Sequence, residues 1–176
     1  MDHFNRRGAP VFSAAMDMSK AFDMVKWQEL FATLIERNVD PLFLRLILFI
    51  YVNQKCNVSW CGNSSQTFNV QNGVRQGGVT SGIFFAVYID RLLVMLRKSG
   101  LGCHIHGIFF GAMIFADDII LLSASRSGLQ AMVNFCQEFA ASRNLKFGTN
   151  VNPMKSKTKC ILFKSNRRNS EYQTRW

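Results

Sequence analysis

The sequence predicts an α+β fold in which helices pack on one face of a mostly antiparallel sheet. Two short apolar runs, residues 114–116 and 119–122, flank Asp117 and Asp118, and each has the length of a buried strand rather than of a helix. They predict a β-hairpin with the two acids at or beside its turn, where aspartate is well tolerated. Amphipathic segments lie between this and other hairpins without the regular strand–helix alternation that is typical of a parallel sheet.

The first third of the chain predicts one strand and two helices. Residues 9–18 are apolar or small and form the strand, which ends near Asp17, and residues 19–23 form a turn. Asp40–Pro41 is a cap followed by a first-turn proline, so the second helix should run from Pro41 to about Asn53. The helix between them has an apolar stripe at intervals of three and four residues: Trp27, Leu30, Phe31, Leu34 and Ile35.

The middle of the chain predicts a hairpin, a glycine-rich loop and a long helix. Residues 56–60 and 66–70 resemble strands, and residues 62–65 form the loop between them. Residues 72–78 contain three glycines, and Thr80 or Ser81 then caps a helix that ends at Ser99–Gly100. The remaining elements follow in order: a strand region at 101–108, the acidic hairpin, a helix capped by Ser127, and strands at 145–147 and 160–163.

Composition predicts a basic intracellular protein with a polyanionic partner. The chain has 176 residues and a net charge of +10, and nine Lys/Arg against one Glu lie from Arg143 onward. This asymmetry favours nucleic acid over a membrane. The five cysteines form no C-x-x-C pair and are interpreted as reduced thiols of a nuclear or cytoplasmic protein. Cys103, His104 and His106 are too few for a zinc site, and the apolar run at 42–52 is too short to cross a membrane.

Three carboxylates are the candidate chemical centre. A sheet can bring the strand end at Asp17 next to a hairpin tip that carries Asp117 and Asp118. Adjacent like charges in apolar surroundings need a cation, and hard oxygen ligands suit Mg²⁺. Such a group could hold two Mg²⁺ ions roughly 3.5–4 Å apart, which is the arrangement of polymerases and nucleases. From the hairpin segment alone, an exposed Asp-Asp turn without function is an equally open interpretation.

Two further segments are weaker candidates. Glycines in the 73–78 loop allow close approach of backbone to a ligand, Gln76 can bond a base or sugar, and Arg75 can bond a phosphate. A plain turn before a capped helix explains the loop equally well. Lys155 and Lys157 could reach a triphosphate, but solvated surface charge is the simpler interpretation of both.

Four segments in order resemble the palm of a reverse transcriptase from a non-LTR (LINE-type) retrotransposon. DMSKAFD at 17–23 resembles the first acidic motif and NGVRQGGVTS at 72–81 the Gln-Gly motif. FADD at 115–118 resembles the Y/F-A-D-D motif, and NPMKSK at 152–157 the later lysine motif. The match covers most of residues 10–163, and four motifs in one order are far more specific than any one of them.

The resemblance implies an RNA-directed DNA polymerase that joins a dNTP to a DNA primer on an RNA template. Its cofactor would be two Mg²⁺ ions, for which Mn²⁺ can substitute. Asp17 and Asp117 would be metal ligands, with Asp118 beside them. Lys155 would be the general acid or a phosphate contact. The oligomeric state is not predicted.

The resemblance also implies how the nucleotide is selected. Phe22 would be the bulky gate under the sugar that excludes ribonucleotides by a clash with the 2′-hydroxyl. Arg75, Gln76 and Gly77 would line the nucleotide and template site. Asp23 would be structural, as a cap of the helix that contains Trp27.

Two departures from the family pattern stand out. Gly82 takes the place of the usual proline, which should loosen the start of the long helix, and Phe115 replaces a tyrosine with little change in bulk. We expect residues 1–163 to be a partial reverse transcriptase domain and 164–176 a basic polar tail. The fingers, the thumb and any endonuclease would lie outside this sequence, which predicts a truncated copy with little activity alone and exposed apolar surface. The alternatives are a catalytically inactive nucleic-acid-binding fragment and an inert product.

Overall fold

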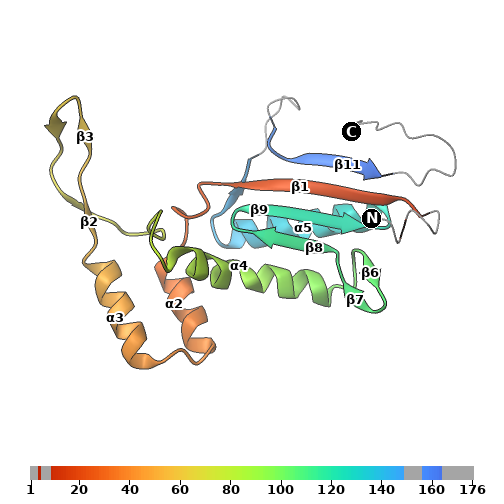
Figure 1. The fold of residues 1–176 in the computed structure, drawn as a ribbon, viewed down its shortest axis with the longest axis horizontal. Coiled ribbons are helices and arrows are strands. Elements are labelled where there is room, and N and C mark those ends of the chain that lie inside the picture. The colour runs from red at the N-terminus through yellow and green to blue at the C-terminus, as the bar shows by residue number, and fades with distance from the viewer. Residues whose placement is uncertain (1–3, 5–8, 149–155, 164–176) are drawn as a thin grey trace. The chain divides into compact units, whose positions relative to one another are not determined.

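The computed structural model describes residue 4, residues 9–148 and residues 156–163. The chain folds into two compact units (Figure 1). The sheet unit comprises residues 1–21 together with 89–176, and the helical unit comprises residues 22–88. The first acidic motif is therefore divided, because Asp17 belongs to the sheet unit and Phe22 to the helical unit.

The sheet unit is built on a five-stranded antiparallel sheet. Its long central strand is β1 (Val11–Ser19), which pairs along one side with β9 (Asp118–Ser123), and β9 in turn pairs with β8 (Ala112–Phe115). The other side of β1 is shared by two shorter strands, β10 (Lys146–Phe147) and β11 (Lys159–Phe163). The predicted antiparallel sheet is confirmed. In the acidic hairpin, β9 lies next to the central strand β1 and β8 is an edge strand.

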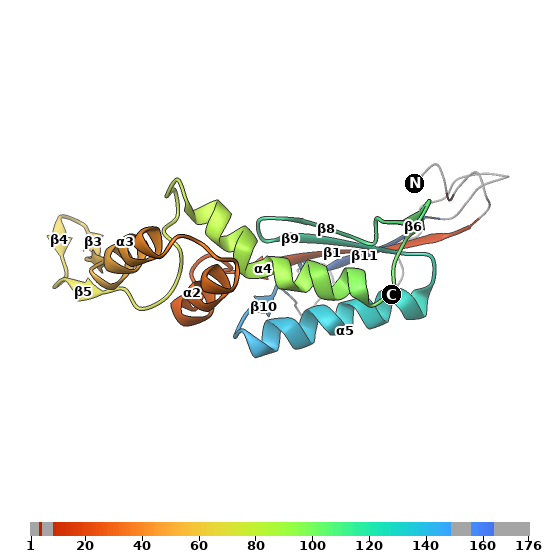
Figure 2. The same ribbon diagram turned by 90° about the horizontal axis from the view of Figure 1, so that it is seen from below.

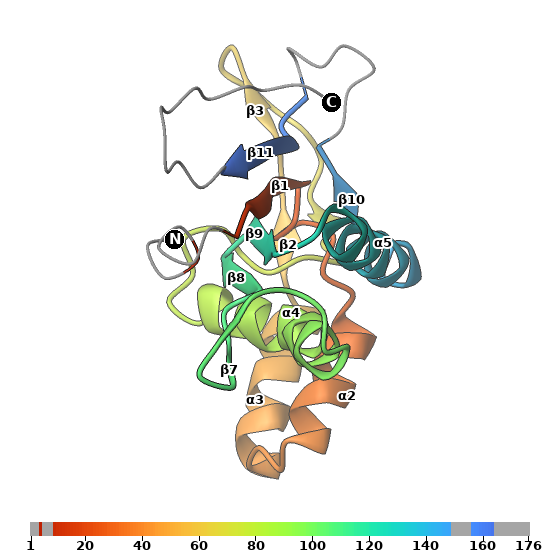
Figure 3. The same ribbon diagram turned by 90° about the vertical axis from the view of Figure 1, so that its right-hand side faces the viewer.

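Helices cover one face of this sheet (Figures 2 and 3). Alternate residues of β9 are buried, with Ile119 and Leu121 fully so, because a strand directs successive side chains to opposite faces. Helix α5 (Arg126–Ser142) packs against β1, β9 and β10. The part of α4 (Ser81–Lys98) that lies in the sheet unit runs along the same face. The opposite face, which carries Ile120, is more open.

The start of α5 differs from the prediction. The helix begins at Arg126, and its cap is Ser125, whose hydroxyl accepts a hydrogen bond from the Gly128 backbone N–H at 3.1 Å. Ser127 therefore lies inside the first turn. Serines at 123, 125 and 127 are equivalent cap candidates by type, and only the extended backbone of Ser125 (φ −136°, ψ 151°) selects one of them.

The connection from α4 to the sheet forms a small hairpin. Strands β6 (His104–Ile105) and β7 (Ile108–Phe109) occupy the predicted strand region. Cys103 is buried, and its backbone N–H donates to the Leu122 carbonyl at 3.0 Å, so this cysteine is part of the core. Among the described residues, no group of three or more His, Cys, Asp or Glu side chains could hold a metal ion.

The helical unit contains α2 (Trp27–Glu36), α3 (Pro41–Val52) and the first turns of α4. Both predicted helices are confirmed. The carboxylate of Asp40 accepts from the Phe43 backbone N–H at 2.9 Å, which fixes the start of α3 as its sequence indicates. Asp23 does not cap α2, because the cap position is Lys26 and no side chain bonds to the first turn there.

The predicted hairpin of the helical unit has a different turn. It consists of β2 (Lys55–Cys56) paired with β5 (Phe68–Asn69), and β3 (Ser59–Trp60) paired with β4 (Asn63–Ser64). The tip is Cys61–Gly62, with φ of 47° and 80°, rather than residues 62–65. Two successive positive φ values give a two-residue turn whose twist matches antiparallel strands, so Asn63 and Ser64 become strand residues.

Two remaining features concern the apolar helices and the cysteines. No helix of the described residues is long and apolar enough to cross a membrane, α3 included. All five cysteines are free thiols. Burial raises the pKa of Cys136 to about 12 and also raises the pKa of Cys103, so both thiols stay protonated and unreactive near neutral pH.

Candidate active site at the acidic hairpin

The register of the sheet brings the predicted carboxylates together. Asp17 on β1 lies directly opposite Asp118 on β9, and Phe115 on β8 lies opposite Asp118 from the other side. Residues directly opposite each other in an antiparallel pair project from the same face, with Cβ atoms roughly 4.5–5.5 Å apart. This is the open face of the sheet. Two aspartates that are 101 positions apart in sequence thus become neighbours.

Asp117 occupies the turn between the two strands. Ala116 and Asp117 form its tip, and Ala116 has a φ of 51°, a left-handed value that is uncommon for a residue with a Cβ. The Asp117 carbonyl accepts a hydrogen bond from the Met18 backbone N–H at 3.1 Å. This bond ties the hairpin tip to the end of β1, so all three acids lie at one end of the sheet.

The charges at this end are only partly balanced. One ion pair is present, between the Lys157 ammonium and Asp17 Oδ2 at 3.0 Å. Neither Asp117 nor Asp118 forms an ion pair with any residue that the structure describes. Asp17 Oδ2 is buried and accepts no well-aligned hydrogen bond from the described residues, although the ammonium is close. A buried carboxylate oxygen with spare acceptor capacity favours a cation at this position.

The donor set fits magnesium. Carboxylate oxygens are hard ligands, and Mg²⁺ commonly binds one or two protein carboxylates while water and substrate phosphates complete its shell. The carboxylates available to such an ion are those of Asp17, Asp118 on the paired strand, and Asp117 at the adjoining turn. In the part of the chain that the structure describes, no group of three or more His, Cys, Asp or Glu side chains is placed to hold a metal ion, so an ion here would have to complete its shell with water and substrate phosphates.

The predicted lysine lies outside the described residues, since these omit residues 149–155 and hence Lys155. Lys157 is the lysine that contacts the acids. From the sequence, surface charge is the simpler interpretation of Lys157, and no role is predicted for Gly148, whose N–H donates to the Asp17 carbonyl at 2.8 Å. The sequence feature that could have indicated this contact is Gly148 itself, a glycine that directly follows the short predicted strand and precedes the basic loop.

The glycine-rich loop is anchored within the helical unit. The Gly73 and Val74 backbone N–H groups donate to the carbonyls of Val25 and Phe22, both at 2.8 Å. The Trp27 indole N–H donates to the Gly73 carbonyl at 2.7 Å. These bonds join the loop to the turn that follows β1 in sequence, so Phe22 and Asp23, the end of the first acidic motif, form one substructure with the glycine-rich loop inside the helical unit.

Gln76, Arg75 and Gly77 are exposed on this loop. The Gln76 side-chain amide donates to the carboxylate of Asp23 at 3.1 Å, and both residues line an open cavity of 290 Å³ together with Arg75 and Gly73. Gly77 has a φ of 76° at the loop's turn. Asp23 therefore orients Gln76 instead of capping α2.

Phe22 has a rigid support. Its ring stacks on that of Phe85 with centroids 4.8 Å apart and an interplanar angle of 22°. Phe85 is fully buried on α4, whereas Phe22 is half-buried. A ring held between a fixed aromatic neighbour and solvent can limit what approaches its free face.

The Gly82 position gives a stability prediction. Gly82 lies in the first turn of α4, and an added Cβ would meet no atom within 4 Å. Gly82→Ala should raise the free energy of unfolding by about 0.4–1 kcal/mol, because alanine reduces the freedom of the unfolded chain and favours the helix. Urea denaturation followed by circular dichroism measures the change.

Gly78→Ala is the matched comparison for this prediction. Its Cβ would lie 2.6 Å from the Ser81 hydroxyl oxygen and 3.1 Å from the Arg75 carbonyl, the two groups that hydrogen-bond to each other at 2.5 Å. We expect it to lower the free energy of unfolding. A stabilising Gly78→Ala, or a destabilising Gly82→Ala, would contradict this description of the junction.

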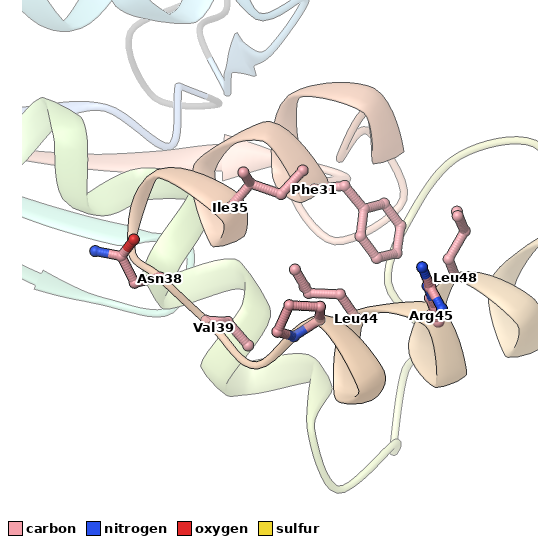
Figure 4. A pocket seen from close by; sticks show the side chains of 8 residues that line it. Phe31, Ile35, Asn38, Val39, Leu44, Arg45 and Leu48 are labelled. Atoms are coloured by element: carbon pink, nitrogen blue, oxygen red, sulfur yellow. The ribbon is translucent and has the colours of Figure 1, made fainter.

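A larger cavity of 590 Å³ lies between α2 and α3 (Figure 4). Its lining is apolar apart from Asn38 and Arg45, and it contains no carboxylate. Exposed apolar side chains continue from it along α3, among them Leu42, Leu46, Phe49 and Ile50. This is the exposed apolar surface expected from the sequence, and its lack of acidic groups excludes it as the metal site.

An antiparallel sheet with helices on one face and aspartates at the tip of its central hairpin is the architecture of a polymerase palm. Residues 2–173 match the family model described as reverse transcriptase (RNA-dependent DNA polymerase). The chain belongs to the reverse transcriptase family. This confirms the family that the four motifs predict.

The relatives that the chain resembles are retrotransposon proteins. It is 30% identical over 144 residues to the Pol polyprotein of the type-2 retrotransposable element R2DM of Drosophila melanogaster, covering 82% of this chain and 14% of that protein. It is 31% identical over 145 residues to the uncharacterized 149 kDa protein of transposon TX1 of Xenopus laevis, covering 80% and 11% respectively. The chain thus spans about one eighth of the length of these relatives.

Two solved telomerase structures have a fold similar to that of this chain. Telomerase from Candida albicans, in complex with a fragment of telomeric RNA, superposes with a TM-score of 0.64 at 15% sequence identity, over 97% of this chain and 30% of that one. Apo telomerase from Candida tropicalis gives a TM-score of 0.63, also at 15% identity, over 97% of this chain and 35% of that one. At this level of identity the similarity establishes the palm fold alone.

Proposed function

We propose that this chain is the palm part of an RNA-directed DNA polymerase of a non-LTR retrotransposon, which extends a DNA primer on an RNA template. The observation that carries the proposal is the register of β1 against β9, which sets Asp17 opposite Asp118 and ties Asp117 to Met18. Family membership supports the reaction class. The aspartates supply the ligands on which phosphoryl transfer by divalent metal depends.

The chain's own residues would mainly position the reactants. Asp17, Asp117 and Asp118 bind the cations, and Phe22 fits against the sugar of the incoming dNTP. Gln76, oriented by Asp23, contacts the nucleotide or template, with Arg75 and Gly77 beside it. Lys155 is proposed as a phosphate contact. When bound, the two Mg²⁺ ions would favour ionisation of the primer 3′-hydroxyl and neutralise the leaving pyrophosphate.

A second candidate is a nucleic-acid-binding fragment without catalysis. The open sheet face displays Phe115, which is 84% exposed, together with Met113 and Ile120. Exposed aromatic rings on a sheet are a common platform for single-stranded nucleic acid, and the net charge of +10 would add phosphate attraction. Both candidates predict binding, and only the first predicts template-directed synthesis.

Single-nucleotide incorporation tests the proposal. The 176-residue chain, a DNA primer annealed to an RNA template and one dNTP at a time are combined with Mg²⁺ or Mn²⁺. We expect addition only of the dNTP complementary to the next template base. Tight binding of the primer–template without any addition would favour the second candidate.

Phe22→Ala should weaken discrimination against ribonucleotides. Removal of the ring that stacks on Phe85 opens space where a 2′-hydroxyl would clash. We expect the ratio of rNTP to dNTP incorporation to rise by roughly 10–100-fold, the range in which a steric pocket discriminates. The same primer-extension assay measures it. Phe49→Ala, which removes an exposed ring on α3, is the matched control, and an unchanged ratio in Phe22→Ala would refute the gate assignment.

A further inference from the structure

Lys157 occupies the position of a cation at the acidic end of the sheet. Its ammonium lies 3.0 Å from Asp17 Oδ2, and its side chain is 65% exposed whereas that of Asp17 is 24% exposed. The lysine therefore approaches a recessed carboxylate from solvent. Because Oδ2 is buried and has no well-aligned hydrogen bond within the described residues, the ammonium is the group that compensates its charge.

Backbone geometry builds this contact. The Gly148 N–H donates to the Asp17 carbonyl at 2.8 Å, and the Lys157 N–H donates to the Gly148 carbonyl at 2.9 Å. Gly148 therefore lies between the two charged residues. A Cβ there would be 3.1 Å from Asp17 Oδ2 and 3.0 Å from Lys157 Cδ. Glycine at 148 thus leaves the gap through which the lysine side chain reaches the carboxylate.

The surroundings of Asp17 make one cation favourable. Asp118 faces it across the strand pair, and Asp117 lies at the adjoining tip. Like charges this close repel each other, and one positive charge between them offsets that repulsion. An ammonium and a divalent cation would use the same acceptor positions on Oδ2, so each excludes the other.

We propose that Lys157 is a built-in counter-ion of Asp17 that competes with the divalent cation for this carboxylate. The inference rests on the proposed function, since it takes Asp17 as a metal ligand. Metal binding releases the lysine, and a nucleotide triphosphate offers the freed ammonium a new anionic partner. Metal and nucleotide therefore favour each other's binding, because the lysine moves from one anion to the next.

The expected effect is modest because the lysine is exposed. An exposed ion pair holds its partners together for only part of the time. While the ammonium occupies Asp17, the apparent affinity of the site for metal is lowered by about two- to sixfold. Removing the Lys157 ammonium should therefore tighten metal binding by the same factor.

Mn²⁺ binding in the absence of nucleotide tests the proposal without any activity assay. Electron paramagnetic resonance of free Mn²⁺ gives the dissociation constant for the full chain. Lys157→Met should bind Mn²⁺ more tightly than wild type, and Lys157→Arg, which keeps the charge, should remain close to wild type. Lys98→Met, an equal loss of charge at the exposed end of α4, is the matched control and should change the affinity far less. Thermal melts establish that each variant is folded.

Two outcomes separate this inference from the proposed function. If Asp17→Asn removes the Mn²⁺ site but Lys157→Met leaves its affinity unchanged or weaker, the counter-ion proposal is wrong and the metal role of Asp17 stands. If wild type has no Mn²⁺ site that Asp17→Asn removes, both fail. Equal tightening in Lys157→Met and Lys98→Met would reduce the effect to net charge and would also overturn the proposal.

Discussion

Asp117→Asn is expected to abolish DNA synthesis while leaving nucleic-acid binding intact. Asparagine is nearly isosteric and keeps the backbone bond from Met18 to the Asp117 carbonyl, but it removes the charge that would hold the metal. Loss of one preorganised electrostatic group typically lowers a rate by about 10²–10³-fold, and loss of a metal ligand should cost at least as much. Affinity for the primer–template should stay unchanged or rise slightly, because one negative charge near phosphates is gone.

Asp40→Asn is the control for this substitution. Asp40 caps α3 through a bond to Phe43, and asparagine caps a helix equally well, so both synthesis and stability should be retained. Nucleic-acid binding that falls in Asp117→Asn as steeply as synthesis would point to a folding defect. Synthesis that survives in Asp117→Asn would remove Asp117 from the metal site.

Gly73→Ala should have the largest effect on stability among the glycine substitutions of the helical unit. Gly73 has a φ of 90°, and its Cβ would lie 3.0 Å from both the Cα and the carbonyl oxygen of Asp23. The left-handed conformation costs a residue with a Cβ about 1–2 kcal/mol, and a clash with backbone adds about 1–3 kcal/mol. We expect the free energy of unfolding, measured in urea, to fall by about 2–5 kcal/mol.

Gly62→Ala separates these two contributions. Gly62 has a similar φ of 80°, yet its Cβ would meet no atom within 4 Å. It should therefore show only the conformational cost of about 1–2 kcal/mol. Equal losses in Gly62→Ala and Gly73→Ala would mean that the loop is not packed against Asp23 as described.

The sequence predicts the acidic hairpin well because local chemistry determines it. Two apolar runs of strand length with a turn-forming Asp between them leave few alternatives to a hairpin. A helix N-cap is predicted equally well where the sequence offers a single candidate, such as Asp40 before Pro41. The order of the four motifs then identifies the reverse transcriptase family, which composition and periodicity cannot identify.

Features that depend on register or on long-range packing could not be predicted. Asp118, rather than Asp117, is the strand partner of Asp17, because the two-residue tip places Asp117 in the turn. Ser125 and Ser127 are indistinguishable as caps until the backbone is known. The contacts of Lys157 with Asp17, and of Gln76 with Asp23, join residues that the sequence separates widely.

Primer extension by the wild-type chain tests the central claim most directly. A DNA primer on an RNA template is incubated with all four dNTPs and Mg²⁺ or Mn²⁺, with EDTA and Asp117→Asn as the two controls. We predict a small amount of DNA product of template-encoded sequence from wild type in the presence of metal, in keeping with a truncated palm, and none from either control. Product that persists in EDTA or in Asp117→Asn would contradict a metal-dependent site at the acidic hairpin.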